Sequence, residues 1–321
     1  MIEDKKPGAE APPLDIIYDC AIVGGGPGGL SAALYMGRMR RSVIVVDGER
    51  GRSTWYQLNN NYLGFPDGVH ARNLREIGQE QAARYGARFL DSYATDARYE
   101  GEGADRRFYV DTSEGTVTAR TLILATGVHD EFPQFEGSDE CIGRSMFWCI
   151  ICDGYEAIEK RVVVLGGGTR AANLALELMV FTPHVTLVAW DGPLRIPEER
   201  LATMREHGIK IYDTICSGFR CAETGFICNL DLEDGSELDL DMLFVAQNMQ
   251  PNNKLAKSLN LMLDENGFVV SDSEQCTNVD GVYAAGDVTH LFNHQVTTAV
   301  HEGGMAAAAA NYYLYDAWQK E

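Results

Sequence analysis

Two cysteines near the middle of the chain carry the clearest chemistry. Cys149 and Cys152 are separated by two isoleucines and followed at once by Asp153 and Gly154. Two thiols at this spacing at a helix start can close a disulfide, and the positive end of the helix dipole favours a thiolate. Asp153 adds a carboxyl group that could move the proton required by thiol–disulfide exchange. We therefore predict a redox-active pair with Asp153 as its acid–base group.

A metal site is the competing interpretation of these cysteines. Zinc takes four ligands, and the sequence has no second Cys-x-x-Cys motif. Cys216, Cys221 and Cys228 are loosely spaced in a segment that alternates like strand and turn, so we interpret them as packing thiols. The three histidines between residues 290 and 301 lack a carboxylate cluster. We predict no metal centre.

A glycine-rich turn near the N-terminus follows an expected strand over 19–23. The turn, Gly-Gly-Gly-Pro-Gly-Gly over 24–29, precedes an expected helix over 30–39. A second expected strand over 42–46 then ends at Asp47. A strand, a glycine turn, a helix and a strand ending in an acid, all within about 30 residues, are the fingerprint of a dinucleotide-binding site.

Each residue of this turn has an expected task. Gly24 allows the sharp turn, and Gly26, followed by Pro27, lets the backbone approach a pyrophosphate. Gly29 lets the helix pack on the strand, and the helix N-terminus offers free N–H groups to the pyrophosphate. Asp47 is placed to accept hydrogen bonds from an adenosine ribose.

The same pattern recurs 142 residues later, counted from Gly24 to Gly166. An expected strand over 161–165 is followed by the glycine turn over 166–171 and an expected helix over 172–180. The next expected strand, over 184–188, leads to Trp190 and Asp191. The second site would use the backbone of Gly166 and Gly168, with Thr169, Arg170, Trp190 and Asp191 around it. Two such units in one chain indicate an oxidoreductase that handles two dinucleotides.

Composition narrows the class of protein. The chain has 321 residues, 47 acidic and 27 basic, and a formal charge of −20. Such a charge repels phosphate backbones and anionic lipid, so we expect neither nucleic acid nor a membrane as partner. Residues 1–13 are charged and proline-containing without an apolar core, which indicates a flexible tail and no signal peptide. We expect a cytoplasmic protein.

Taken together, these motifs resemble the low-molecular-weight thioredoxin reductase family, from about Tyr18 to Leu314. The resemblance rests on the two glycine turns and the cysteine pair, and on Asn61 in Asn-Tyr-Leu-Gly-Phe-Pro, Ala125-Thr126-Gly127, Gly286-Asp287 and Gln295. It implies an α/β fold of two Rossmann-like domains, the second inserted into the first. The expected boundaries are 14–129 with 251–321 for the FAD-binding domain, and 130–250 for the domain with the cysteine pair.

The resemblance also implies roles for single residues. Asn61 would touch the polar groups of the flavin, Asp287 its ribityl chain, and the backbone of Gln295 and Val296 its ring system. Cys152 would face the flavin, and Cys149 would attack the disulfide of a thioredoxin-like partner. The resemblance also implies a homodimer. Because the cysteine pair belongs to the second domain and the flavin to the first, we expect two domain arrangements, one with the disulfide at the flavin and one with it turned outward to a partner. The remaining FAD-binding positions carried over are Ala94, Ala125, Thr126, Gly127 and Gly286.

Several departures from the family pattern concern the electron donor. Members that use NADPH carry a His-Arg-Arg cluster for its 2′-phosphate, and here those positions read Ala189-Trp190-Asp191. Asp191 would repel that phosphate and suits an unmodified ribose. On the flavin side, Arg52 stands where glutamine is usual and His294 where arginine is usual.

The chain thus resembles the branches of the family that do not depend on pyridine nucleotide. One branch takes electrons from ferredoxin, and another, the diflavin-linked disulfide oxidoreductases, holds a second FAD in the second site. We expect FAD or NADH there instead of NADPH, and favour FAD. An acidic ferredoxin would need a basic patch such as the arginines between residues 38 and 52. An ordinary NAD(P)H-dependent thioredoxin reductase and a non-catalytic redox sensor remain as alternatives.

Overall fold

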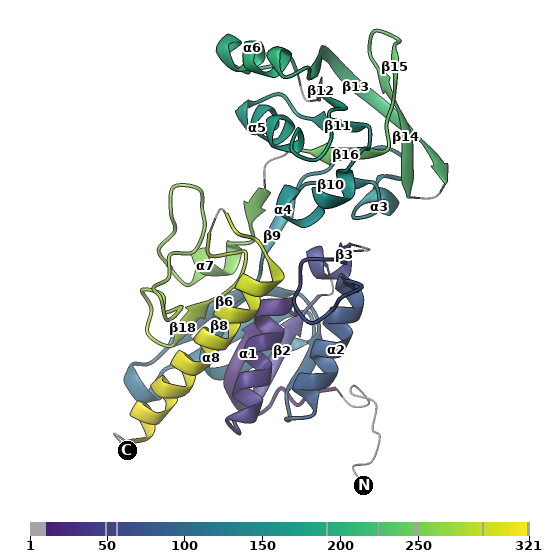
Figure 1. Ribbon diagram of the computed structural model, residues 1–321. Helices are drawn as coiled ribbons and strands as arrows, with labels where there is room; N and C mark the ends of the chain where they lie inside the picture. The colour runs from purple at the N-terminus through teal and green to yellow at the C-terminus, as the bar shows by residue number, and fades with distance from the viewer. Residues whose placement is uncertain are drawn as a thin grey trace. The chain divides into compact units, whose positions relative to one another are not determined.

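The computed structural model describes residues 11–48, 50–55, 57–190, 192–223, 225–246, 249–290 and 292–319. The chain forms two compact units, which we describe separately (Figure 1). The first unit consists of Met1–Thr54, Ala71–His129 and Gln250–Glu321, and the second of Trp55–His70 and Asp130–Met249. The expected fold class, α/β with two Rossmann-like domains, is confirmed.

The first unit is built on a mixed sheet with strand order β5-β2-β1-β8-β7-β6, and β18 also pairs with β8. The pairs among β5, β2, β1, β8 and β18 are parallel, whereas β7 and β6 are antiparallel additions. The strands are β1 (Ile17–Val23), β2 (Val43–Asp47), β5 (Arg88–Asp91), β6 (Ala94–Glu100), β7 (Arg107–Thr112), β8 (Gly115–Leu124) and β18 (Val282–Ala284).

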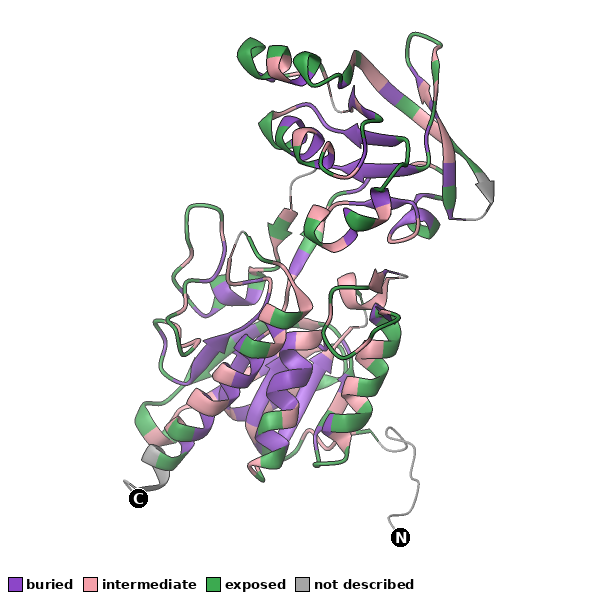
Figure 2. Cartoon of the chain, in the orientation of Figure 1, coloured by how far each residue is buried: buried purple, intermediate pink, exposed green. Residues whose placement is uncertain are grey.

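The central strands of this sheet are runs of apolar residues because both of their faces are buried. Every residue of Cys20–Val23 and Val43–Val46 is buried, and the centre of this sheet is coloured as buried in Figure 2. The helices of the unit are α1 (Pro27–Arg38), α2 (Ala71–Ala83), α7 (Lys254–Ser258) and α8 (Val296–Gln319), with short 3₁₀ turns η1 (Arg52–Thr54) and η2 (Gly103–Asp105). Helix α8 lies alongside α1 (Figure 1).

The second unit repeats the design with strand order β10-β16-β11-β12-β13-β14-β15. Its first five strands pair in parallel, and β14 and β15 extend the sheet as an antiparallel meander. The strands are β10 (Met146–Phe147), β11 (Val162–Leu165), β12 (Val185–Ala189), β13 (Lys210–Glu223), β14 (Phe226–Leu232), β15 (Glu237–Asp239) and β16 (Met242–Val245).

Short elements complete the second unit and the connections. The helices are α3 (Ser138–Cys141), α4 (Ile150–Asp153), the 3₁₀ turn η3 (Tyr155–Ala157), α5 (Thr169–Leu178) and α6 (Glu198–Glu206). Two small two-stranded sheets pair β3 (Leu58–Asn59) with β4 (Val69–His70) and β9 (Val128–Asp130) with β17 (Met249–Pro251). Within the described residues, no helix combines the length and the apolar character needed to cross a membrane.

The helices that follow the two glycine turns, α1 and α5, begin earlier than the sequence pattern predicts. Helix α1 starts at Pro27 instead of residue 30, because proline at the first helical position needs no hydrogen-bond partner for its nitrogen and its φ angle already suits a helix. Helix α5 starts at Thr169 instead of residue 172. The glycine turns are therefore shorter, and their last residues already belong to the helices.

Close packing of α8 on α1 depends on a glycine. A Cβ atom at Gly303 would lie 2.0 Å from the carbonyl oxygen of Gly28 and 3.1 Å from the nitrogen of Ala32. Ser31 ties the same pair of helices together, because its Oγ donates a hydrogen bond of 2.7 Å to the carbonyl oxygen of Val300. The long C-terminal helix is thus held against the start of the helix that follows the first glycine turn.

We expect Gly303→Ala to destabilise the protein, because the added methyl group must push two helix backbones apart. Overpacking of this kind costs about 1–3 kcal/mol. The matched control is Gly304→Ala, where a Cβ would meet only the half-exposed ring of Tyr35, at 3.4 Å. Alanine favours a helix over glycine by about 1 kcal/mol, so the control should be neutral or stabilising. The thermal unfolding midpoints of the two FAD-loaded variants measure these effects. Equal midpoints for Gly303→Ala and Gly304→Ala would contradict the packing argument.

Candidate functional site

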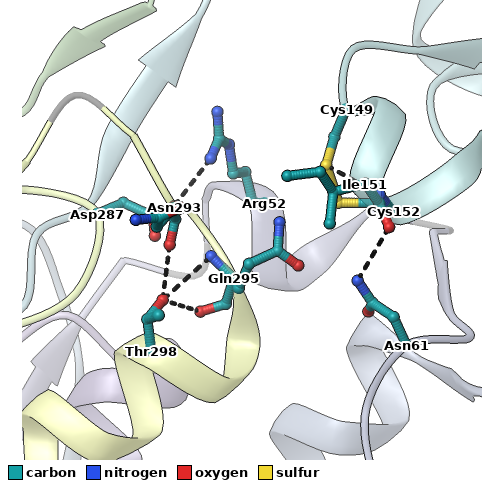
Figure 3. The surroundings of a disulfide bond; sticks show 9 residues. All are labelled: Arg52, Asn61, Cys149, Ile151, Cys152, Asp287, Asn293, Gln295 and Thr298. Atoms are coloured by element: carbon teal, nitrogen blue, oxygen red, sulfur yellow. Dashed lines mark hydrogen bonds and ion pairs between the residues drawn. A yellow bond between two sulfur atoms is a disulfide. The ribbon is translucent and has the colours of Figure 1, made fainter. Parts of the chain in front are cut away.

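The predicted cysteine pair is a disulfide in the second unit. The Sγ atoms of Cys149 and Cys152 are 2.06 Å apart, and both side chains are half-buried (Figure 3). Cys149 is the N-cap of α4, and its Sγ accepts a hydrogen bond of 3.2 Å from the backbone N–H of Cys152. The expected helix start is confirmed, but α4 is a single turn, so its dipole is weak. Direct donation by an N–H group is the stronger influence on a thiolate here.

Asp153 lies directly after this disulfide and is only 3% exposed. Burial, and then the nearby carboxylate of Glu156, raise the pKa of Asp153 to about 8. Its side chain interacts with Gln57, while its Oδ2 is buried with no hydrogen-bond partner among the described residues. A protonated carboxyl group explains this arrangement, because a charged oxygen without a partner would be costly to bury. At neutral pH Asp153 therefore holds a proton beside the disulfide, as its predicted acid–base role requires.

Two aromatic rings support Trp148, the residue that precedes Cys149. Trp148 packs edge-on against Trp55, with ring centroids 4.9 Å apart, and against Phe132 at 5.4 Å. Trp55 and Phe132 are in turn 5.5 Å apart, so the three rings form a closed cluster. Such edge-to-face contacts are favourable and directional. They fix the backbone immediately before Cys149. No sequence motif reveals this cluster, because its members are far apart in the chain.

The segment Trp55–His70 groups with the second unit and surrounds the disulfide turn with polar groups. Asn61, which the resemblance assigned to the flavin, donates its Nδ2 hydrogen to the carbonyl oxygen of Ile151 at 3.5 Å (Figure 3). Asn60 donates to Glu156 Oε1 at 2.6 Å. The backbone of Gln57 lies so close to Gly143 that a Cβ there would approach it to 2.7 Å. The flavin role of Asn61 stays a prediction.

The first glycine turn has the geometry of a dinucleotide cradle. Gly24 has a φ of 109°, and a Cβ there would lie 2.1 Å from the carbonyl oxygen of Ala125. A Cβ at Gly29 would lie 1.9 Å from the carbonyl oxygen of Gly24. At Gly26, by contrast, the nearest protein atom to a Cβ would be Ser53 Oγ at 3.9 Å. The protein thus fills the space at Gly24 and Gly29 and leaves it open at Gly26, where a pyrophosphate is expected.

The start of α1 is also available to an anion. Gly26 is its N-cap, and no side chain caps this end of the helix. Free N–H groups at an uncapped helix start are the donors that phosphate groups use. Asp47 ends β2 beside the turn, and a Cβ at Gly25 would lie 2.4 Å from Asp47 Oδ2. The same oxygen forms an ion pair of 2.8 Å with Arg75 Nη2. These residues fit the phosphates and ribose of a dinucleotide.

Arg52 and His294, the two departures on the flavin side, lie in one cluster with Asp287. Arg52 Nη1 forms an ion pair of 2.9 Å with Asp287 Oδ2 (Figure 3). His294 Nε2 donates to the carbonyl oxygen of His290 at 2.5 Å, so its Nδ1 carries a lone pair. Burial lowers the pKa of His294, and Nδ1 has no partner among the described residues. A neutral His294 therefore presents an unused acceptor next to Asp287.

Further residues of the first site follow the ends of two strands, β8 and β18. Thr126 Oγ1 donates to the carbonyl oxygen of Asn252 at 2.8 Å, between the half-buried Ala125 and Gly127. The backbone N–H of Gly286 donates to Glu302 Oε2 at 2.6 Å, which ties the segment after β18 to α8.

The other three predicted contributors, Gln295, Val296 and Ala94, lie at the starts of α8 and β6. Gln295 precedes α8, which begins at Val296, and its N–H donates to Thr298 Oγ1 at 3.3 Å (Figure 3). Ala94 opens β6 and packs against the apolar core of the unit. All the predicted FAD residues except Asn61 therefore belong to the first unit, and their contacts with FAD stay predictions.

The second glycine turn repeats these features in its own unit. A Cβ at Gly166 would lie 3.0 Å from the Cβ of Ala171, whereas a Cβ at Gly168 would meet nothing within 4 Å. Gly168 is the N-cap of α5 without a side-chain cap, and Thr169 and Arg170 are exposed at the helix start. This turn therefore also has room and donors for a pyrophosphate.

The positions that distinguish nucleotides are only partly described. Trp190 follows β12 and is half-buried against the apolar core of the unit. Asp191, predicted to bind a ribose, lies outside the described residues. Among the described residues, no three histidine, cysteine or acidic side chains gather as metal ligands would.

Comparison with known proteins assigns the family. The model of the pyridine nucleotide-disulphide oxidoreductases matches residues 18–305. The thioredoxin reductase of Treponema pallidum is 31% identical, over 92% of this chain and 97% of that protein. The chain belongs to this oxidoreductase family.

Two solved structures extend this result. The structure of HlmI has a TM-score of 0.87 and 27% identity, over 97% of this chain and 96% of that one. The atypical thioredoxin reductase TRi from Desulfovibrio vulgaris Hildenborough is 34% identical over 93% of this chain and 98% of that one, with a TM-score of 0.52. The expectation that this oxidoreductase is an FAD-dependent enzyme of disulfide chemistry is confirmed.

Some residues around the disulfide of this oxidoreductase could not be found from motifs. Glu156 raises the pKa of Asp153 through its charge, and Gln57 lowers it through a hydrogen bond. The rings of Trp55 and Phe132 pack against Trp148. Trp148 offered a signal, since it directly precedes Cys149. Gln57 offered none, because nothing in its sequence neighbourhood connects it to Asp153.

The raised pKa of Asp153 predicts how stability depends on pH. The folded chain keeps this proton up to about pH 8, whereas the unfolded chain releases it near its ordinary pKa of about 4. The stabilisation is therefore complete below about pH 4 and is lost as pH rises through about 8. Asp153→Asn removes this dependence.

The free energy of unfolding of the oxidised Asp153→Asn variant should rise relative to that of the parent as pH increases from about 5 to about 9. The expected relative gain is a few kcal/mol, the order of magnitude that a pKa shift of several units produces. Thermal unfolding of both FAD-loaded proteins across this range measures the difference. The control is Asp139→Asn, on an exposed residue of α3. A difference between Asp153→Asn and the parent that stays constant with pH would contradict a protonated Asp153.

Proposed function

We propose that this enzyme passes electrons from FAD in the first unit to the Cys149–Cys152 disulfide, and from there to a thioredoxin-like dithiol protein. Cys149 is the thiol that attacks the partner, and Cys152 is the thiol that faces the flavin. The supporting observation is the formed disulfide at an N-cap, followed by a buried carboxyl group that carries a proton at neutral pH. That proton can go to the thiolate that leaves when a disulfide opens.

The proposal includes the domain division expected from the sequence, with FAD held by 14–129 and 251–321 and the disulfide carried by 130–250. Bound FAD would supply the two-electron reductant. Gly24, Gly26 and Gly29 would shape its pyrophosphate site, Asp47 would bind its ribose, and the Arg52–Asp287 pair would border its ribityl chain. Arg52 neutralises Asp287 in a half-buried setting, where an unpaired carboxylate would be costly. A homodimer is part of the same proposal.

For the second nucleotide site we propose FAD, with NADH as the other candidate and NADPH disfavoured. The open space at Gly168 and the uncapped start of α5 support a bound pyrophosphate. The sequence Ala189-Trp190-Asp191 offers no guanidinium for a 2′-phosphate. The enzyme would then belong with the diflavin-linked disulfide oxidoreductases.

The contacts of the basic cluster count against ferredoxin as the donor. Arg52 pairs with Asp287, and the guanidinium of Arg50 lies over the ring of Tyr93. Arg41 donates to Asn311 and lies over Tyr315, and Arg38 donates to Tyr85. Among these described residues, only Arg52 is neutralised by a carboxylate, whereas the neutral partners of the other three arginines leave their charges in place. The cluster therefore offers an acidic partner one positive charge fewer than its sequence suggests.

Counting FAD per chain, after acid release from the purified protein, tests the second flavin. We expect about two FAD per chain, one for each glycine turn. Gly168→Val should lower the count to about one without unfolding the chain, because a Cβ at Gly168 meets no protein atom within 4 Å. Gly26→Val is the matched variant in the first turn and should remove the other FAD. If the parent holds about one FAD per chain and Gly168→Val holds the same amount, the proposal of a second flavin is refuted.

Cysteine variants and electron donors test the route of the electrons. With the flavin reduced by dithionite, the parent should reduce an added thioredoxin, whereas Cys149→Ser and Cys152→Ser should not. Cys152→Ser retains the attacking thiol and should form a stable mixed disulfide with thioredoxin, which Cys149→Ser cannot form.

NADPH, added without oxygen, should leave the flavin absorbance unchanged. Rapid bleaching by NADPH would overturn our proposal that NADPH is not the electron donor, while leaving the disulfide route intact. Failure of the parent to reduce any disulfide protein would overturn the route itself and favour a redox sensor.

A further inference from the structure

A second pair of sulfur atoms lies close together within the second unit. Cys141, at the end of α3, and Cys221, on β13, have their Sγ atoms 3.6 Å apart. Both are free thiols, and they are separated by 80 residues in the sequence. The Sγ atom of Cys141 also donates to the carbonyl oxygen of Gly137 at 3.3 Å. The other two thiols of the β13–β14 hairpin, Cys216 and Cys228, likewise each donate to a backbone carbonyl oxygen.

The elements that carry this pair are fixed to one another. Ser145 Oγ donates to the carbonyl oxygen of Gly225 at 2.9 Å and accepts from the N–H of Ile227 at 3.0 Å. A Cβ at Gly225 would lie 2.6 Å from the carbonyl oxygen of Glu140, the residue next to Cys141. The end of α3 and the hairpin are therefore in backbone contact, which holds the two thiols near each other.

The two thiols differ in exposure in the way that an attacking and a resolving thiol would. Cys221 is exposed, whereas Cys141 is buried. Burial and the adjoining thiol raise the pKa of Cys141 to about 12, so Cys141 stays protonated at neutral pH. A reagent in solution therefore meets Cys221 first. Closing a disulfide requires the sulfur atoms to approach from 3.6 Å to about 2.05 Å, within reach of side-chain rotation.

We propose that Cys141 and Cys221 are a second redox-active dithiol, which small-molecule disulfides convert to an intrachain disulfide. The Cys221 thiolate attacks one sulfur of the small disulfide, forms a mixed disulfide with it and releases one small thiol. Cys141 then gives its proton to solvent and attacks Cys221 Sγ, which releases the second small thiol. The two protein thiols lose two electrons and two protons in total, and the small disulfide gains them.

The disulfide would join α3 to the β13–β14 hairpin. Since α3 is followed by β10 and then by Cys149, the new bond would constrain the segment that leads into the active disulfide. This site is separate from the proposed electron route, which uses Cys149 and Cys152 only. Failure of one proposal therefore leaves the other standing.

Oxidised glutathione, added in excess to the FAD-loaded full chain, is the test reagent. After its removal, thiols are counted in denaturant, and the six free cysteines should fall to four. A tryptic digest should contain the fragments with Cys141 and Cys221 joined and lighter by two hydrogens. The count and the mass are measured on the unchanged chain, so they do not depend on any variant folding.

Two matched variants then identify the partner of Cys141, because the tryptic fragment with Cys221 also contains Cys228. The joined fragments should persist in Cys228→Ser and disappear in Cys221→Ser. Glutathione bound to the protein without joined fragments would overturn the proposal. Joined fragments that persist in Cys221→Ser would overturn it as well, since Cys228 would then be the partner.

Discussion

The rest of the site depends on one constraint. At the carboxyl edge of the first sheet, backbone segments approach one another too closely for a side chain to fit between them. Gly24 lies against Ala125, Gly29 lies against Gly24, and Gly303 lies against Gly28, each at a distance that excludes a side chain. These contacts bring together a strand end, a helix start and the C-terminal helix, which are far apart in sequence. Because the protein fills every space except the one at Gly26, the turn retains a single opening suited to a pyrophosphate.

A second constraint governs the chemistry of the disulfide. Asp153 is buried beside Glu156 and interacts with Gln57, so its proton stays bound at a pH at which an ordinary carboxyl group is ionised. The motif Cys-x-x-Cys-Asp supplies the carboxyl group, but its pKa is determined by residues outside the motif. The same burial destabilises the ionised form, which links the function of this carboxyl group to the pH dependence of the fold.

Local features were predictable where the chemistry is local. The glycine turns, their flanking strands and the disulfide follow from adjacent residues, and the structure confirms these elements with shifts of a few residues at the helix starts. The aromatic cluster of Trp55, Phe132 and Trp148 and the pairing of Cys141 with Cys221 were not predictable, because each joins residues that meet only after folding.

The sequence by itself determined the class of fold, the two glycine turns and the cysteine pair that forms the disulfide. These depend on short-range rules: a glycine where a Cβ cannot fit, a proline at a helix start, two thiols one helical turn apart. Only the tertiary structure decided that burial raises the pKa of Asp153, that Arg52 pairs with Asp287 and that Asn61 contacts the turn bearing the disulfide. The physical reason is that desolvation and ion pairing depend on which distant residues come to surround a group.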